Sequence, residues 1–352
     1  MKKILSVIVP TYNMEHYLSA CLDSVVGSQA AAALDVVVVN DGSKDSSLSI
    51  AQHYAQHYPD VVRVIDKPNG NYGSTINAAL LTLKGEYVKI LDADDTYDTA
   101  AIAPFVAYLE QVSGADMVVA PFVEIDNRGE HRVDYNLYSR KIYGYGVPYR
   151  AEQIFEDGNI AYFMMHSVAY RTALLQQMGY RQSEGISYTD QQWCFFPILG
   201  VQTIAFTDIA LYRYNLTRQG QTMDSKVQLR SIKQLAQVVT SMAEHLDNYG
   251  KSLSTARYDF LAGVVVRRMQ TVLRKYLLEM EDDDFANSDF LQTLSIFKTL
   301  APQPITVMVN GRLKIDLLAR WEREGSRYPM WMRRVLMTAD KLMMSLYKLI
   351  FN

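Results

Sequence analysis

Three carboxylates stand within four residues in the segment Asp92-Ala93-Asp94-Asp95. The apolar run before them, Tyr87 to Leu91, is typical of a buried strand, so the cluster follows a predicted strand end. Carboxylates crowded in this way repel one another unless cations or many hydrogen-bond donors are present. Their hard oxygen ligands favour Mg²⁺ or Mn²⁺ over zinc. The segment therefore predicts a divalent cation site, with a solvated acidic turn as the alternative.

Two other predicted strand ends carry polar residues. Asp41, in Asn40-Asp41-Gly42-Ser43, could accept a hydrogen bond from a base imide or a ribose hydroxyl, or could serve as an ordinary helix-cap or turn residue. The first strand is followed by Pro10-Thr11-Tyr12-Asn13, where a dinucleotide-binding fold would carry a glycine-rich phosphate loop. This turn contains no glycine, which excludes that motif.

The strands that position these residues are predicted from short β-branched runs that are apolar without alternation. They are Ser6 to Val9, Asp35 to Val39, Val61 to Ile65, Tyr87 to Leu91 and Asp116 to Ala120. The segments between them have helical spacing, with starts marked by Ser43 and Asp45, by Ser74, and by Asp98 or Thr99. Buried strands that alternate with helices indicate a parallel sheet in an α/β sandwich. Ligands bind beyond the carboxyl ends of such strands, which is where the polar motifs lie.

The later part of the chain differs in character. Residues 127–157 lack clear periodicity, which predicts loops and edge strands over the sheet. Beyond Asp224, apolar residues fall at helical spacing in Ile232 to Leu246 and in Phe260 to Leu278, and Arg327 to Asn352 is helical again. These patterns predict a helical C-terminal region.

Composition narrows the classes of function. The 352 residues include 35 Lys and Arg against 38 Asp and Glu, a net charge of −3, which gives no global field to attract a nucleic-acid backbone. Two cysteines, Cys21 and Cys194, are too few for a disulfide framework or a Cys-rich zinc site and fit a reducing cytoplasm. The apolar run from Ile4 to Val9 ends too early for a signal peptide, and the longest chargeless stretch, Gln191 to Thr207, falls short of a membrane span. We therefore expect a cytoplasmic globular protein without a nucleic-acid partner.

Three segments together resemble the family 2 glycosyltransferases of the GT-A fold, in their order and in their spacing. They are Val7-Ile8-Val9-Pro10-Thr11-Tyr12-Asn13, Val39-Asn40-Asp41-Gly42-Ser43-Lys44-Asp45 and Gly85-Glu86-Tyr87-Val88-Lys89-Ile90-Leu91-Asp92-Ala93-Asp94-Asp95. The resemblance covers residues 4–222. It implies an α/β fold with a Rossmann-like, mixed, mostly parallel sheet flanked by helices, and a nucleotide-sugar-binding catalytic domain at residues 1–224. Residues 225–352 would then form the helical C-terminal region.

The resemblance also implies a set of nucleotide-sugar-binding residues. They are Pro10, Thr11, Tyr12, Asn13, Asp41, Gly73, Ser74, Asp92, Ala93, Asp95, Arg218 and Gln221. Within this set, Asp41 would bind the uracil edge and Asp92 would lie near the ribose. Asp94 would hold the Mn²⁺ or Mg²⁺ ion that bridges the two phosphates.

Three further residues are candidates for the reaction itself. The segment Tyr188-Thr189-Asp190-Gln191-Gln192-Trp193 resembles the family's Glu-Asp pair before an aromatic residue, which makes Asp190 the candidate general base; the alternative is a helix N-cap. The segment Tyr212 to Thr222 resembles a closing loop of bacterial members, in which Arg218 would meet the diphosphate; the alternative is a surface Arg beside a flexible Gly. His166 would contact the acceptor or the metal. The alternative, which is the commoner role, is a buried core residue whose ring nitrogens have hydrogen-bond partners.

These residues and the resemblance together predict an inverting, metal-dependent glycosyltransferase, and the resemblance implies a setting in bacterial cell-surface polysaccharide assembly. It would move a sugar from a nucleotide-sugar, with UDP as the expected nucleotide, to a hydroxyl of a glycan or lipid-linked acceptor. A sugar nucleotidyltransferase would need a Gly-rich basic loop where Pro10 to Asn13 stands. A catalytically silent nucleotide-sugar sensor or scaffold is the other alternative, and the presence of Asp94 and Asp190 argues against it.

The last residues of the chain have the pattern of a basic amphipathic helix. Arg334, Lys341 and Lys348 recur every seven residues, while Met332 and Val335 begin an apolar face. A basic amphipathic helix at residues 327–352 could lie on the anionic inner face of the membrane, or could pack against its own domain. The sequence makes no prediction of the oligomeric state.

Overall fold

The computed structural model describes residues 2–134, 143–218, 225–309 and 315–339. Its internal contacts divide the chain into two compact units. The first unit comprises Met1–Gln219 and Leu253–Phe260, and the second comprises Gly220–Ser252 and Leu261–Asn352. The predicted domain boundary after residue 224 lies outside the described residues and stays a prediction.

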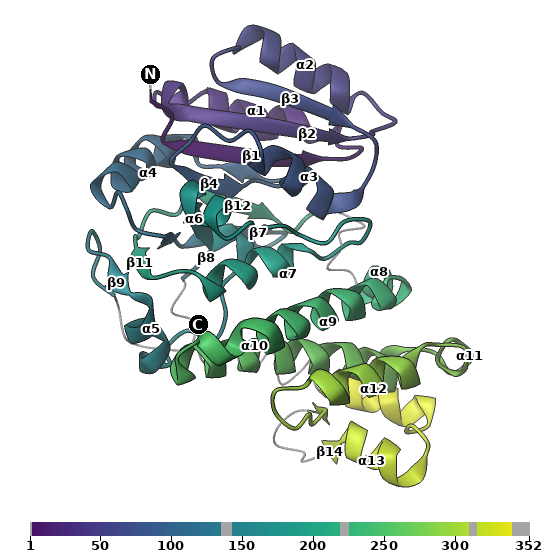
Figure 1. Ribbon diagram of the computed structural model, residues 1–352. Helices are drawn as coiled ribbons and strands as arrows, with labels where there is room; N and C mark the ends of the chain where they lie inside the picture. The colour runs from purple at the N-terminus through teal and green to yellow at the C-terminus, as the bar shows by residue number, and fades with distance from the viewer. Residues whose placement is uncertain (1, 135–142, 219–224, 310–314, 340–352) are drawn as a thin grey trace. The chain divides into compact units, whose positions relative to one another are not determined.

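An eight-stranded sheet forms the centre of the first unit (Figure 1). Its strands, in spatial order, are β3 (Val62–Lys67), β2 (Leu34–Asp41), β1 (Leu5–Thr11), β4 (Tyr87–Ile90), β10 (Val168–Arg171), β6 (Met117–Val119), β11 (Thr203–Phe206) and β9 (Tyr149–Arg150). The strands from β3 to β4 are parallel, β10 is antiparallel to both of its neighbours, and β9 is antiparallel to β11. The predicted mixed, mostly parallel sheet is confirmed, and its five predicted strands correspond to β1, β2, β3, β4 and β6.

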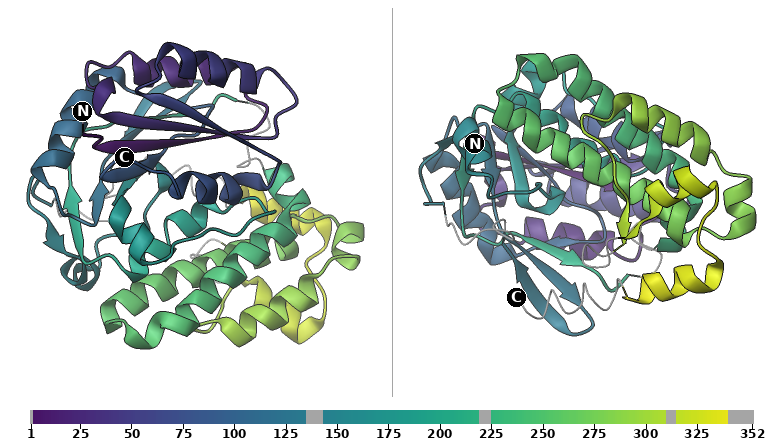
Figure 2. Two further views of the ribbon diagram at one scale, coloured as in Figure 1. Left: turned by 45° about the horizontal axis from the view of Figure 1, so that its top comes forward. Right: turned by 90° about the horizontal axis from the view of Figure 1, so that it is seen from below.

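Helices cover both faces of this sheet, and the left view of Figure 2 shows them on either side of the N-terminal strands. Over the described residues up to 218, the helices are α1 (Leu18–Val26), α2 (Ser47–His57), α3 (Asn71–Leu80), α4 (Thr99–Gln111), α5 (Ala151–Asp157), α6 (Thr172–Gln177) and α7 (Asp190–Trp193), with the 3₁₀ turns Ala31–Ala33, Met165–Ser167 and Phe196–Leu199. The prediction for α4 is confirmed, because the Asp98 side chain accepts a hydrogen bond from the Ala100 N–H at 3.0 Å.

The predicted start of α3 at Ser74 is wrong. The helix begins three residues earlier, at Asn71, whose φ of 65° lets the chain enter the helix directly after Gly70. The Ser74 hydroxyl does not cap the helix. It donates to the Asn71 carbonyl at 2.8 Å within the first turn and accepts from Lys67 Nζ at 2.8 Å.

A second, four-stranded sheet has the order β5 (Thr96–Tyr97), β12 (Tyr212–Asn215), β7 (Phe122–Asp126) and β8 (Gly129–Val133). Strand β8 is at the edge of this sheet and β9 is at the edge of the large one, as predicted for residues 127–157. The helix α5 at the end of that range was not predicted. Residues 135–142 of the range lie outside the described residues.

The second unit is mainly helical, which confirms the predicted C-terminal region. It contains α8 (Ser225–Arg230), α9 (Ile232–Tyr249), the 3₁₀ turn Gly250–Ser252, most of α10 (Thr255–Arg274), the π-helical turn Lys275–Glu279, α11 (Asp282–Ala286), α12 (Phe290–Leu300), the strands β13 (Met308–Val309) and β14 (Ile315–Asp316), α13 (Leu317–Glu324) and a helix over residues 330–339. The apolar positions predicted for α9, from Ile232 to Leu246, are buried.

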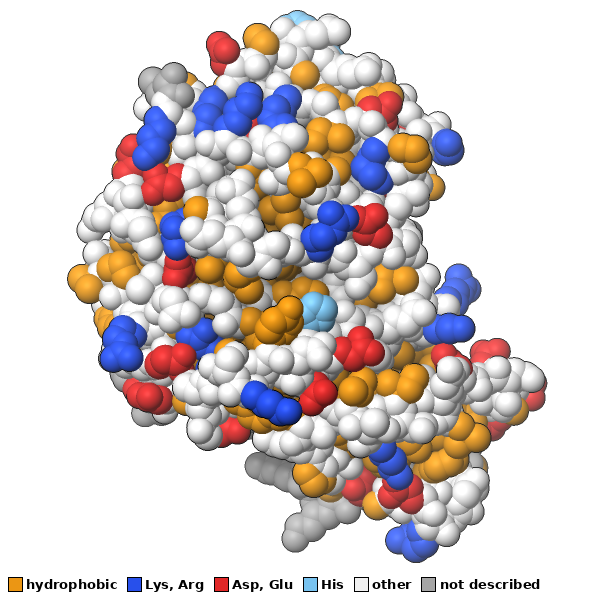
Figure 3. All heavy atoms as spheres, in the orientation of Figure 1, with side chains coloured by type: hydrophobic (Ala, Val, Ile, Leu, Met, Phe, Trp, Pro, Cys, Tyr) orange, Lys and Arg blue, Asp and Glu red, His pale blue; other side chains and the backbone are white. Residues whose placement is uncertain are grey.

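The surface carries charges of both signs. On the face drawn in Figure 3, Lys and Arg side chains are interspersed with Asp and Glu side chains. Among the described residues, we find no helix with the length and apolarity that a membrane crossing requires.

A buried ion pair connects the first three strands. Asp35, 2% exposed, lies between the Arg63 guanidinium at 2.8 Å and the Ser6 hydroxyl at 2.8 Å, and it also accepts from the Lys84 N–H at 3.0 Å. Burial disfavours the Asp35 charge, but the hydrogen bonds from Arg63, Lys84 and Ser6 outweigh it and hold the pKa of that carboxyl below its usual value.

We expect Asp35→Asn to lower the free energy of unfolding by about 3 kcal/mol at pH 7, because it leaves the partly buried Arg63 without its counter-ion. Since the folded-state pKa of Asp35 is the lower one, its contribution is present above the unfolded value near 4 and is lost as the pH falls through the folded value. Urea denaturation at pH 7 and pH 3 measures both effects. The exposed Asp60→Asn is the control, and an equal loss at both pH values would contradict the prediction.

Candidate active site

Several predicted site residues lie at the carboxyl ends of strands in the middle of the large sheet. Strands β1, β2 and β4 are parallel neighbours, so their carboxyl ends lie together. Thr11 ends β1, Asp41 ends β2, and Asp92 follows β4 by two residues. The chain therefore brings three separate sequence segments to one place.

Asp41 is part of a buried ion pair. The side chain is 2% exposed, and its Oδ1 accepts from Lys67 Nζ at 2.7 Å and from the Gly70 N–H at 3.0 Å. Helix α2 begins six residues later, at Ser47, so Asp41 does not cap it. Lys67 also donates to Ser74, so a lysine that was not predicted connects two of the predicted site residues, Asp41 and Ser74.

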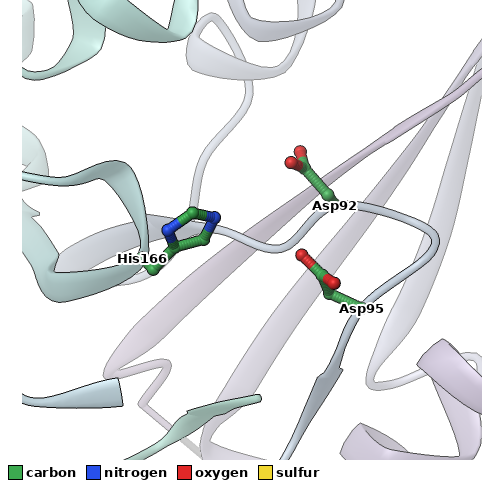
Figure 4. A group of neighbouring side chains, drawn as sticks. All are labelled: Asp92, Asp95 and His166. Atoms are coloured by element: carbon green, nitrogen blue, oxygen red, sulfur yellow. The ribbon is translucent and has the colours of Figure 1, made fainter. Parts of the chain in front are cut away.

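The acidic cluster after β4 faces a histidine. Ligand atoms of Asp92, Asp95 and His166 all lie within 4.8 Å of one another, and Figure 4 shows the three side chains converging on one space. Asp95 is 1% exposed and accepts from the Tyr212 hydroxyl at 2.6 Å and from the Asn215 N–H at 2.7 Å. These two donors come from β12, so the small sheet holds the cluster in place.

The electrostatics of this cluster favour a bound cation. Burial and the charges of Asp95 and Asp94 raise the pKa of Asp92 well above its usual range. Burial and the Asp94 charge raise the pKa of Asp95 to about 7. In both residues, burial and neighbouring negative charges disfavour the ionised carboxylate. A divalent cation bound beside them would supply positive charge that favours it.

His166 is both a packed residue and a neighbour of the site. Its ring is 9% exposed and stacks on Tyr214, with centroids 4.1 Å apart. Burial and the Lys89 charge lower the pKa of His166 to about 3, so the imidazole is neutral at physiological pH. Its Nδ1 is buried and has no hydrogen-bond partner among the described residues. A neutral imidazole in this setting can act as a metal ligand.

Asp94 pairs with Arg218. Arg218 Nε lies 2.7 Å from Asp94 Oδ2, and the two side chains are only 22% and 13% exposed. The Arg218 side chain is therefore mostly buried, whereas Gly220, the glycine of the alternative interpretation, lies outside the described residues. Gln221, predicted in the same segment, lies outside the described residues.

Asp190 is presented by a rigidly packed turn. It is the first residue of α7, and Thr189 occupies the N-cap position. Trp193, in the same turn, is fully buried between the edges of Tyr170 and Tyr180. Burial, the Asp92 charge and then the Asp190 charge raise the pKa of Tyr72 well above its usual range, which places Asp190 near the acidic cluster.

Gly73 allows α3 to approach the segment that leads to Asp190. A Cβ atom at Gly73 would lie 2.0 Å from the Ser183 carbonyl oxygen. Ser183 is in turn held by Gln192 of α7, whose amide accepts from the Ser183 N–H at 2.8 Å and donates to its hydroxyl at 2.9 Å. Gly73 was predicted to bind the nucleotide-sugar, and this close contact is an additional reason for a glycine.

The turn after β1 is anchored to the turn after β2. The Asn13 N–H donates to the Ser43 hydroxyl at 3.1 Å, and the Asn13 amide oxygen accepts from the Lys44 N–H at 2.8 Å. The other predicted residues of this part differ in exposure: Pro10, Thr11 and Ala93 are buried, whereas Tyr12 is 46% exposed. Tyr12 is therefore exposed enough to contact a ligand, whereas Thr11 is 1% exposed.

Several residues of the site were not predicted. Tyr72 donates to Asp92 at 2.9 Å, Tyr212 and Asn215 hold Asp95, and Lys67 pairs with Asp41. Lys89 is buried in β4, and its Nζ donates to the His166 carbonyl at 2.6 Å and to the Val168 carbonyl at 3.1 Å. A charged residue within a buried apolar strand is an available signal for Lys89, because such a charge needs local partners.

We expect Gly73→Ala to displace the segment that carries Asp190. The added methyl would force backbone atoms apart, since its closest neighbour is a carbonyl oxygen, and overpacking of this kind costs roughly 1–3 kcal/mol. Thermal unfolding and a sugar-transfer assay should both show a loss. Gly263→Ala is the control, because only the end of the Arg267 side chain lies near its Cβ position. Unchanged stability and turnover in Gly73→Ala would contradict this role.

Comparison with known proteins identifies the family. Residues 6–179 match the family model described as glycosyl transferase family 2. The chain is 36% identical over 124 residues to an uncharacterized glycosyltransferase of Mycoplasma pneumoniae, covering 34% of this chain and 40% of that protein. It is 29% identical over 229 residues to the poly(ribitol-phosphate) β-N-acetylglucosaminyltransferase TarS of Staphylococcus aureus, covering 62% of this chain and 37% of TarS. The matches therefore span about two fifths of these two relatives.

A solved structure shows the same fold. The crystal structure of S. aureus TarS 1-349 in complex with UDP-GlcNAc superposes with a TM-score of 0.64 and 23% sequence identity, covering 85% of this chain and 82% of that chain. The matched family model and this shared architecture agree with the three strand-end motifs and with the mixed sheet. The chain belongs to glycosyltransferase family 2 and has the GT-A fold.

Proposed function

We propose that this protein transfers a sugar from a UDP-sugar to a hydroxyl of a glycan or lipid-linked acceptor, with inversion at the anomeric carbon. The observation that carries the proposal is that Asp41 and the acidic cluster lie at the carboxyl ends of parallel strands of one sheet, with the Asp190 charge contributing to the raised pKa of Asp92. The TarS relative, which was crystallised with UDP-GlcNAc and is named for poly(ribitol-phosphate), supports a UDP donor and a polymeric acceptor.

The residues present fit a divalent cation. Two carboxylates, Asp92 and Asp95, and the neutral His166 imidazole with its buried, unpartnered Nδ1 form a hard oxygen and nitrogen donor set that suits Mn²⁺ or Mg²⁺. Asp94, the predicted ligand, is not one of these three residues and pairs with Arg218. In this proposal Asp94 would hold the ion next to them. When bound, the cation would neutralise charge on the diphosphate.

The chain's own residues would supply the remaining steps. Asp41 would accept a hydrogen bond from the uracil, and Asp92 would lie near the ribose. Asp190 would take the proton of the acceptor hydroxyl as that oxygen forms its bond to the anomeric carbon. The bond from this carbon to the diphosphate oxygen breaks on the opposite face, and its electron pair leaves with UDP. Arg218 would stabilise the developing charge of the leaving group.

We expect Asp94→Asn to abolish the enhancement of UDP binding by Mn²⁺ while the fold is kept. The substitution removes the carboxylate charge but keeps the shape of the side chain. Isothermal calorimetry with UDP, in the presence and absence of Mn²⁺, measures the effect, with the exposed Asp60→Asn as control. Metal-enhanced binding that persists in Asp94→Asn would refute the metal assignment.

We expect Asp190→Asn to keep donor affinity and to lose transfer. The residue would act on the acceptor, and a positioned general base contributes roughly 10²- to 10⁴-fold to the rate. Turnover should therefore fall by at least about a hundredfold, whereas the exposed Glu156→Gln should behave as wild type. Near-normal transfer would place the base elsewhere. A wild type that binds UDP-sugar but neither hydrolyses nor transfers it would favour the silent sensor.

We also propose that residues 327–352 associate peripherally with an anionic membrane. The helix over residues 330–339 has one packed face, with Arg333 and Leu336 buried, and one exposed face. Trp331 is 65% exposed, Val335 is 58% exposed, and Arg334 lies between them on the exposed face. Exposed Trp and Arg suit the interface of an anionic bilayer. Lys341 and Lys348 lie outside the described residues.

Trp331→Ser should reduce co-sedimentation with phosphatidylglycerol liposomes at low salt, and high salt should weaken binding of the wild type. A point substitution is preferable to deletion of the segment, because buried Arg333 pairs with Asp282 at 2.5 Å. The control is Leu291→Ser, which removes another exposed apolar side chain, 66% exposed. A wild type that never co-sediments would end this proposal.

A further inference from the structure

Arg218 forms an ion pair with Asp94, the residue that the proposed function assigns as the metal ligand. Its Nε lies 2.7 Å from Asp94 Oδ2, and its surroundings hold it in this position. The guanidinium lies 3.8 Å from the Met14 sulfur and 5.8 Å from the centre of the Tyr17 ring. Both neighbours follow the turn after β1, which is one wall of the proposed nucleotide site.

The segment before Arg218 is anchored independently of this ion pair. The Asn215 N–H donates to Asp95 at 2.7 Å, and the Asn215 amide oxygen accepts from the Thr217 N–H at 3.0 Å and from its hydroxyl at 2.6 Å. The backbone up to Thr217 thus has its own connections to the acidic cluster. A change of partner by Arg218 can be confined to its side chain.

A guanidinium and a divalent cation compete for one carboxylate. Each neutralises part of the Asp94 charge, and the two positive groups repel each other at short distance in a site of reduced dielectric. A diphosphate changes this balance, because it offers the guanidinium bidentate acceptors of its own.

We propose that Arg218 is an internal counter-ion of Asp94, which releases this carboxylate when the cation and the nucleotide bind together and then pairs with the diphosphate. This inference rests on the proposed function. It makes Arg218 a positioning residue that weakens cation binding to the free protein and couples it to nucleotide binding. By linkage, UDP and Mn²⁺ then raise each other's affinity by the same factor.

The test is a titration of Mn²⁺ followed by electron paramagnetic resonance, with and without UDP. Without UDP, Arg218→Gln should bind Mn²⁺ more tightly than wild type by about fivefold or more, the lower end of usual coupling. Arg218→Lys keeps the positive charge and should stay close to wild type. Arg213→Gln, which removes an Arg of β12 that pairs with Glu130, is the matched control. The gain in Mn²⁺ affinity caused by UDP should shrink in Arg218→Gln.

Two outcomes separate this inference from the proposed function. If Asp94→Asn loses Mn²⁺ binding but Arg218→Gln binds Mn²⁺ as wild type does, the counter-ion role is overturned and the metal site stands. If Asp94→Asn still binds Mn²⁺ normally, the metal assignment itself fails, and this inference fails with it.

Discussion

The crowding of Asp92, Asp94 and Asp95 at the end of a buried strand is the constraint on which the rest of the site depends. Three carboxylates in four residues would be strongly destabilising without compensation. In the folded chain, each carboxylate has its own hydrogen-bond donor or positively charged partner. Tyr72 donates to Asp92, Tyr212 and Asn215 donate to Asp95, and Arg218 pairs with Asp94. The compensation is incomplete, as the raised pKa values of Asp92 and Asp95 show.

This constraint explains why two sheets are needed. The large sheet brings the ends of β1, β2 and β4 together, as parallel pairing requires. The small sheet supplies the donors, because β12 carries both Tyr212 and Asn215 and pairs with β5, directly after the cluster. Helix α3 contributes the third element, since Gly73 allows it to approach the segment that leads to Asp190.

The sequence predicted the features that depend on local pattern. The five strands, the Asp98 cap and the mixed sheet follow from hydrophobic runs, capping residues and family motifs, and all are confirmed. The start of α3 was missed because the Ser74 hydroxyl is used by Lys67 and by its own helix. Contacts between distant segments could not be predicted: Tyr212 is 117 residues from Asp95, and neither residue's sequence context indicates the other. The proximity of His166 to the cluster is hidden for the same reason.

We propose that a metal ion at Asp94 completes the carboxylate cluster. The most direct measurement is anomalous diffraction at the manganese edge from crystals grown with Mn²⁺ and UDP. We expect a peak at about 2.2 Å from an Asp94 carboxylate oxygen, with Arg218 turned to the diphosphate. Clear density for UDP without a manganese peak at Asp94 would contradict it.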